Sequence, residues 1–301
     1  MTAVLQTHLG ETAALLTALC WTLNAIVFEA AGKKVGSMAV SYLRIFVAFA
    51  LLCLSAYFTR GLFLPTDATV HNWIWLMLSG ALGFVLGDMF LFEAFVLIGS
   101  RISLLIMSAA PPLTALVGFL LMGEQMSLLN LAGMFVTMLG IAIVIMSKNP
   151  QEKKIKFNRP AKGIIFASLG AFGQAMGLIF SKYGMGSYNV LAATQIRLIA
   201  AFIAYTIIIS IRSQWPEIRA AFKHKLAIGN ITLGAILGPF IGVSLSLLAL
   251  KHTASGIVSS ISSVSPVLII PLSMSIFKEK IFPKEILGAF VSISGVILLF
   301  L

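Results

Sequence analysis

Long apolar runs separated by short polar connections dominate the pattern along this chain. There are ten, at residues 11–31, 38–59, 72–98, 101–122, 126–147, 162–182, 190–211, 226–250, 254–277 and 281–301. Each is long enough to cross about 30 Å of hydrocarbon, where backbone polar groups must be satisfied within a helix. The runs lack the alternation at every second position that marks strands of an outer-membrane barrel. The pattern therefore predicts an all-α integral membrane protein with ten transmembrane helices.

Composition supports this prediction and excludes a soluble fold. Of 301 residues, 59% are hydrophobic and 10% are charged, whereas a soluble domain has about 25% charged residues. Both cysteines, Cys20 and Cys53, lie inside apolar runs, so no disulfide framework is expected. A soluble enzyme, a disordered chain and a nucleic-acid-binding protein are all excluded.

The net charge of +11 lies mainly in the connections on one side of the predicted bundle. Ten crossings place both termini on one face, whose connections carry three basic residues, Arg60, Lys182 and Lys251, against sixteen on the other. Cytoplasmic loops of membrane proteins carry an excess of Lys and Arg. The charge therefore predicts a multi-pass protein of the cytoplasmic membrane with both termini outside.

The chain also resembles itself at an offset of 155 residues. Residues that coincide include the pairs Pro111/Pro266, Glu124/Glu279, Gly133/Gly288 and Gly140/Gly295. The repeat divides the chain into 1–147, a basic connection at 148–161, and 162–301, with five runs in each half. An odd number of crossings makes the second half enter the membrane from the opposite side. Such inverted five-helix repeats are typical of transporters that work by alternating access.

Several motifs recur in both halves. A proline occurs in the fourth and ninth runs ("SAAPPLTAL", "SSVSPVLII"), an acidic residue follows ("LMGEQMS", "IFKEKIF"), and a glycine-bearing run comes next ("LAGMFVTMLGI", "ILGAFVSISGV"). Arg44 in "SYLRIFVAF" and Arg197 in "TQIRLIAAF" also correspond. In these motifs nearly the whole chain resembles the drug/metabolite transporter superfamily, specifically its EamA-type ten-helix members. The resemblance implies a monomer without a cofactor, with a solute cavity between the halves and runs five and ten at the periphery.

Two carboxylates, Asp88 and Glu93, fall inside the third run, where an acidic residue is costly unless it is paired, hydrated or protonated. At 1.5 Å per residue from the cytoplasmic end, Glu93 lies about 8 Å deep, Arg44 about 9 Å and Asp88 about 15 Å. We expect Glu93 and Arg44 to form an ion pair, either structural or part of a gate. We expect Asp88 to contact the solute or bind a coupling proton. The alternative is a protonated aspartic acid bonded to a neighbouring helix.

The other candidates for solute binding are polar or aromatic residues within the runs: Trp21, Asn24, Ser108, Gln174, Arg197 and Ser263. Interhelical hydrogen bonds or packing are the alternative roles for the neutral polar residues. Arg197 either receives a solute carboxylate, or snorkels or caps backbone carbonyls. Pro111 and Pro266 are candidate hinges, because proline breaks the helical hydrogen-bond ladder.

The sequence favours a carrier over an enzyme or a channel. Its aspartates are Asp67, in a connection, and Asp88, so an aspartyl dyad within the membrane is excluded, and no metal-binding HExxH motif occurs. No ring of like charges indicates a channel filter. We therefore predict a secondary transporter that exports small organic metabolites such as amino acids. The alternatives are a translocator of sugar phosphates, nucleotide sugars or lipid-linked substrates, and a multidrug exporter.

Overall fold

The structure is a computed structural model that describes residues 8–147, 160–272 and 282–301. Helices account for almost all of these residues, which contain no strand. The first half contains α2 (Leu9–Val35), α3 (Ser37–Arg60), α4 (Val70–Gly80), the π-helix η1 (Ala81–Gly87), α5 (Asp88–Met107), α6 (Ala110–Met122) and α7 (Leu128–Ser147). The second contains α8 (Pro160–Met185), α9 (Val190–Ile211), α10 (Trp215–Ala221), α11 (Lys225–Ala235), η2 (Ile236–Gly242), α12 (Val243–His252), α13 (Ser255–Ser262), α14 (Ser265–Leu272) and α15 (Pro283–Leu299).

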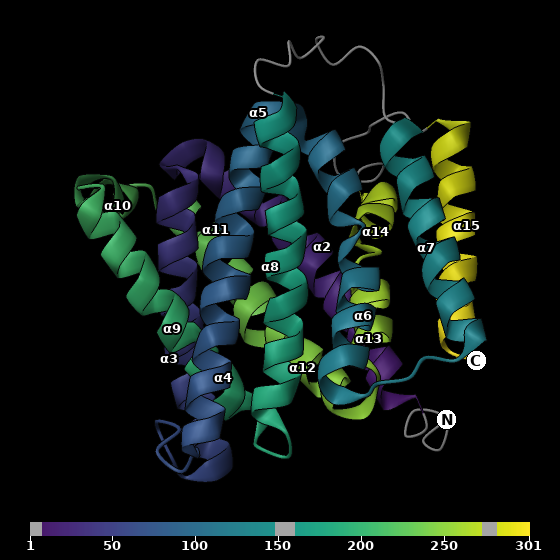
Figure 1. Cartoon of the computed structure of the whole chain (residues 1–301). Coiled ribbons are helices and arrows are strands. Elements are labelled where there is room, and N and C mark those ends of the chain that lie inside the picture. The colour runs from purple at the N-terminus through teal and green to yellow at the C-terminus, as the bar shows by residue number, and fades with distance from the viewer. Residues whose placement is uncertain (1–7, 148–159, 273–281) are drawn as a thin grey trace.

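The all-α membrane fold is confirmed. In the described part of the chain, eight helical segments are long and apolar enough to span a membrane, and Ser255–Leu268 forms a shorter apolar segment. The helix α15 is also apolar but has 17 residues. The number of ten crossings and the inverted relation of the two halves remain predictions. The beginning of α2 and the end of α15 lie at the same end of the bundle (Figure 1), which we call the termini-side end.

One predicted connection is absent from its expected place. The sequence predicted a break at residues 99–100, but α5 continues through it to Met107. The chain leaves the helix at Ser108 and Ala109, directly before Pro111 and Pro112. Proline has no N–H and clashes with the carbonyl four residues earlier, so it ends a helix more effectively than a single glycine does.

Two π-helices occur at the same position in the two halves. The segments Ala81–Gly87 and Ile236–Gly242 are separated by the same 155 residues as the sequence motifs. A Cβ atom on Gly87 would lie 3.2 Å from the carbonyl oxygen of Leu82, and one on Gly242 would lie 2.8 Å from that of Leu237. The wide π turn therefore brings a backbone oxygen against each glycine. A larger residue would not fit without displacing the turn.

Close helix contacts assemble the bundle around these π-helices. The helix α8 packs along α4, η1 and α5, while α2 packs along α11, η2 and α12. Glycine allows this approach, because a Cβ on Gly177 of α8 would lie 2.8 Å from the Cα of Gly83. The helices α7 and α15 pack on each other at one edge of the bundle (Figure 1), the place expected for runs five and ten.

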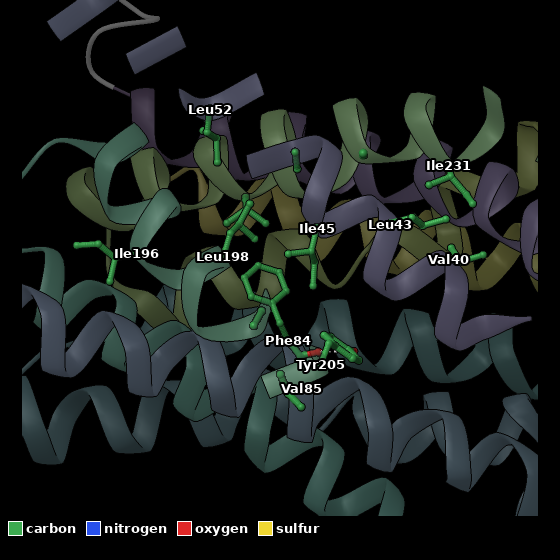
Figure 2. Close-up of a cluster of buried hydrophobic side chains, with 14 of the residues drawn as sticks. Val40, Leu43, Ile45, Leu52, Phe84, Val85, Ile196, Leu198, Tyr205 and Ile231 are labelled. Atoms are coloured by element: carbon green, nitrogen blue, oxygen red, sulfur yellow. Dashed lines mark hydrogen bonds between the residues drawn. The ribbon is translucent and has the colours of Figure 1, made fainter. Parts of the chain in front are cut away.

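The largest cluster of buried apolar side chains lies between α3, α9, α11 and η1. Its members include Leu43, Ile45, Ile196 and Leu198 (Figure 2). The hydroxyl group of Tyr205, which is 2% exposed, donates to the carbonyl oxygen of Phe84 at 2.9 Å. This bond ties α9 to the middle of the first π-helix, where π geometry leaves carbonyl groups without their usual partners.

Candidate functional site

A buried ion pair occupies the end of the first π-helix. Arg44 projects from α3, and Asp88 is the first residue of α5, directly after η1. Nη2 of Arg44 lies 2.6 Å from Oδ2 of Asp88, and the two side chains are 7% and 17% exposed. A charge-assisted hydrogen bond of this length is strong. The guanidinium group of Arg44 also lies over the ring of Phe28, 5.1 Å from its centre.

Gln174 of α8 completes this cluster. Its Nε2 donates to Oδ1 of Asp88 at 3.2 Å, so each oxygen of the carboxylate accepts a hydrogen bond. The amide of Gln174 also packs beside Gly87, since a Cβ there would lie 3.4 Å from Nε2 of Gln174. The cluster connects α3 and α5 of the first half with α8 of the second. Arg44, Asp88 and Gln174 are named the midspan cluster below.

The structure pairs Arg44 with Asp88, so the expected pair of Arg44 with Glu93 is wrong. Five residues separate Asp88 from Glu93, which turns Glu93 about 140° round the helix. Its side chain is accordingly exposed. The depth count also treated arginine as a point, although a long side chain spans several ångströms along the membrane normal. Arg44 therefore reaches the deeper acid.

Arg197 also lies against the first π-helix. It is 5% exposed, and its Cζ lies 4.9 Å from the centre of the Phe84 ring. Its Nε is buried without a hydrogen-bond partner, and no ion pair to it is found in the described part of the chain. A Cβ on Gly83 would lie 3.5 Å from Nη2 of Arg197. Among the residues that the structure describes, no carbonyl accepts a hydrogen bond from the Nε of Arg197, and its low exposure excludes snorkelling.

Asn24 and Trp21 lie on α2, apart from the midspan cluster. Asn24 is 2% exposed, and its Oδ1 has no hydrogen-bond partner in the described ranges of the chain. Its amide packs against η2, because a Cβ on Gly238 would lie 2.8 Å from Nδ2. Trp21 is partly buried against the largest apolar cluster. A solute-binding role for either residue remains a prediction.

The candidate serines and prolines lie at helix breaks. The hydroxyl of Ser108 donates to the carbonyl of Leu105, and that of Ser263 donates to the carbonyl of Ser260. These local bonds favour the structural role that the sequence left open for them. Pro111 and Pro266 lie in the first turns of α6 and α14, so each directly follows a break. Movement about these breaks remains a prediction.

A second polar cluster joins four chain segments at the termini-side end. Oε1 of Glu124, which follows α6, lies 2.5 Å from Nζ of Lys182 in α8, while its Oε2 accepts from the backbone N–H of Ser255 at 2.8 Å. Nζ of Lys182 donates to the carbonyl of Thr253 at 2.6 Å, and the Thr253 hydroxyl donates to Glu11 of α2 at 2.5 Å. These five residues are named the end cluster.

Only part of the end cluster can be predicted from the sequence. The repeat marks Glu124, whereas Lys182 counts only among the charges of the connections and no motif marks Glu11. The position of Lys182 at the apolar end of a predicted span, at the same membrane face as Glu124, is the feature of the sequence that could identify it as a partner. The repeat partner of Glu124, Glu279, lies outside the described residues.

A third polar group lies in the connections at the same end. Asp67 accepts from Nη2 of Arg60 at 2.5 Å and from the hydroxyl of Tyr188 at 2.8 Å. Desolvation raises the pKa of Asp67, but these two hydrogen bonds more than offset it, so the pKa lies below its ordinary value. Desolvation, together with the bond to Asp67, raises the pKa of Tyr188 to about 12. A surface pocket of about 350 Å³ adjoins this group and is lined also by His71, Asn72 and Tyr183.

An apolar pocket of about 310 Å³ lies between α9 and the segment formed by η2 and α12. It is lined by Val190, Leu191, Phe240, Ile241, Ser244, Leu245 and Leu248. Neither this pocket nor the polar one includes a residue of the midspan cluster. The apolar pocket is suited to an alkyl chain, whether of a lipid or of a solute.

These features define the class of protein: a multi-pass helical membrane protein with buried ionic groups between its spans. Comparison with known proteins identifies the family. The model of the EamA-like transporter family matches residues 8–146 and again residues 161–301, so the chain belongs to that family. The resemblance seen in the motifs is thereby confirmed.

Individual relatives agree with this assignment. An uncharacterized transporter of Archaeoglobus fulgidus is 24% identical over 288 residues, which cover 95% of this chain and 96% of that protein. A solved structure, described only as the crystal structure of a protein, has 17% sequence identity and a TM-score of 0.77 over 96% of this chain and 95% of its own. The latter supports the fold alone. The protein is thus a membrane transporter by family.

Proposed function

We propose that the protein is a secondary transporter that exports small organic metabolites, with amino acids as the expected class, by alternating access. The midspan cluster carries this proposal, because ionised groups inside a membrane are costly and mark solute and ion pathways. Its members Arg44, Asp88 and Gln174 come from both sides of the connection at 148–161. Relative movement of the two halves would therefore make or break this cluster.

The end cluster supports the alternating-access part of the proposal. Bonds among Glu124, Lys182, Thr253, Ser255 and Glu11 hold α2, α6, α8 and α13 together at one end. We propose that these bonds form the closed gate at the outer face and separate when solute leaves. Lys182→Met should then increase labelling, from the termini side, of a cysteine introduced at Ser259 between α13 and α6. Unchanged labelling would remove the end cluster from the gate.

Asp88 is the proposed centre of solute binding or proton coupling. Arg44 already neutralises its charge, so a solute ammonium group or a proton must compete with Arg44 to bind there. Loss of uptake by Asp88→Asn at every pH from 5.5 to 8 would indicate solute binding. Loss of the pH dependence alone would indicate proton coupling.

The test of the proposal is solute counterflow in proteoliposomes that contain the purified full-length protein. Vesicles loaded with an unlabelled amino-acid mixture should accumulate labelled amino acids, because a carrier exchanges one solute molecule for another and a channel does not. Asp88→Asn should abolish this accumulation. Glu93→Gln is the matched control, since it removes an exposed acid from the same helix and should leave counterflow unchanged. Absence of counterflow by the folded wild type for amino acids, nucleosides and sugar phosphates would contradict the proposal.

The proposed location is the cytoplasmic membrane, with both termini outside and a single chain as the working unit. Cysteine labelling in intact cells tests this topology. Residues 1 and 158 should react from opposite sides of the membrane. Reaction of both from the same side would contradict the prediction of ten crossings.

The apolar pocket favours a second candidate, a translocator of lipid-linked substrates. Its lining of Leu191, Phe240 and Leu245 with their neighbours is suited to an acyl chain. Leu245→Trp should fill the pocket. Under this candidate the variant would stop transport of a substrate that carries an alkyl tail. Under the main proposal, counterflow of amino acids should continue.

A further inference from the structure

We infer that Arg197 is the receptor for a carboxylate group of the transported solute. The inference rests on the proposed function and narrows the solute to organic anions and zwitterions that carry a free carboxylate. Two buried arginines at corresponding positions of the two halves differ in whether they have a counter-ion. Arg44 has Asp88 as its counter-ion. Arg197 has no counter-ion among residues 8–147, 160–272 and 282–301.

This difference has a source in the sequence. The repeat aligns Arg44 with Arg197 when a two-residue gap is allowed, and its offset of 155 residues places Val243 where Asp88 stands in the first half. Val243 is 3% exposed, so an apolar side chain occupies the interior at that position. The second half has therefore kept the buried cation and replaced the acid that would neutralise it.

The usual ways of accommodating a buried arginine do not apply to Arg197. Arg197 is 5% exposed, so its side chain does not snorkel to water, and its buried Nε has no hydrogen-bond acceptor among the described residues. Stacking on Phe84 at 4.9 Å offsets part of the desolvation of the cation. A cation that is stacked but not paired remains unfavourable in a membrane interior, and binding of an anion would relieve it.

The shape of the free donor edge indicates a carboxylate. The Nε and Nη2 groups of arginine form a planar fork that matches the two oxygens of a carboxylate. In Arg197 the Nε lacks an acceptor, and Nη2 faces Gly83, which carries no side chain. The donor fork of Arg197 therefore faces the backbone of the π-helix at Gly83, where no side chain occupies the space. Separation of the halves at this surface would admit a small planar anion.

Ligand-dependent thermal stability of the full-length protein in detergent tests this inference without requiring transport. Wild-type protein is heated with a mixture of amino acids, with the corresponding amino-acid amides, and with a mixture of sugar phosphates. We expect the acids to raise the melting temperature at concentrations at least tenfold lower than the amides do. Arg197→Gln should abolish this preference for the acids. Arg212→Gln is the matched control, because Arg212 is exposed at the end of the same helix.

Arg197→Lys keeps the experiment decisive if Arg197→Gln fails to fold. Lysine retains the positive charge but lacks the fork, so we expect roughly tenfold weaker stabilisation by the acids. Equal stabilisation of the wild type by acids and amides would overturn the inference, as would an undiminished preference in a folded Arg197 variant. Stabilisation by sugar phosphates alone would overturn the assignment to a carboxylate. Failure of wild-type counterflow together with intact acid-selective stabilisation would count against the proposed function and leave the receptor in place.

Discussion

The two halves of the chain share a π-helix at corresponding positions but carry different charges beside it. Each half has a π-helix at the same place in the 155-residue repeat, followed by an α-helix, and each has a buried arginine in its second long helix. In the first half Asp88 neutralises Arg44, whereas in the second Val243 stands in the place of Asp88 and Arg197 has no counter-ion among the residues that the structure describes. These differences in charge are the basis for the proposal that the two halves take different steps of transport.

The largest effect on stability should follow from breaking the ion pair between Arg44 and Asp88. Asp88→Ala leaves Arg44 buried without a counter-ion, and loss of one member of a buried pair costs about 3–5 kcal/mol. We expect this destabilisation in thermal or denaturant unfolding of the purified protein. The double variant Arg44→Gln, Asp88→Asn should recover part of the loss, because no unpaired charge remains. Glu93→Ala, at an exposed position, should change the stability by less than about 0.5 kcal/mol.

Supplying the missing acid should make the second half resemble the first. Val243→Asp introduces a carboxylate at the repeat position of Asp88. We expect it to pair with Arg197, with a coupling free energy of about 1–3 kcal/mol in a double-variant cycle with Arg197→Gln. The pair should also weaken acid-selective stabilisation, because the new carboxylate would compete with the solute. A coupling free energy near zero would contradict the equivalence of the two positions.

The glycine contacts of the two π-helices should respond differently to substitution. A Cβ at Gly177 would meet the Cα of Gly83, whereas one at Gly238 would meet the side-chain amide of Asn24, both at 2.8 Å. Backbone cannot move aside as easily as a side chain does. We expect Gly177→Ala to cost about 1–3 kcal/mol by overpacking, and Gly238→Ala to cost less. Gly229→Ala is the control for both, since nothing lies within 4 Å of its Cβ position, and it should stabilise α11 slightly.

The fold could be predicted from the sequence more completely than the site could. Apolar run length predicted the helical membrane class, and the recurring Pro, Glu and Gly motifs predicted the family. Depth counting failed to pair Arg44 with the correct acid, because pairing depends on the rotation of each helix and on side-chain reach. The π-helix before Asp88 alters that rotation, and no periodicity in the run shows it. The role of Lys182 escapes the sequence for a related reason, because its partners Glu124 and Thr253 come from two segments that are distant in sequence.

The smallest effect concerns the connections between the second and third helices of each half. In the first half, Asp67 is bonded to Arg60 and Tyr188. In the second, α10 fills the corresponding place and packs Ile218 and Ala221 into the apolar core. The stability that the first connection contributes should therefore depend on pH, and the stability that the second contributes should not.

The sign of this pH dependence follows from the direction of the two pKa shifts. The pKa of Asp67 is lowered on folding, so its contribution is present above its unfolded pKa of about 4 and is lost as the pH falls through the folded value. The pKa of Tyr188 is raised to about 12, so its contribution is present below its unfolded pKa of about 10 and is lost as the pH rises through 12. Because the Asp67 side chain is 43% exposed, screening by solvent should limit the loss to no more than about 1 kcal/mol. The free energies of unfolding of wild type and Asp67→Asn, measured from pH 3 to 7, should converge toward low pH. A constant difference across that range would assign the effect to packing instead of charge.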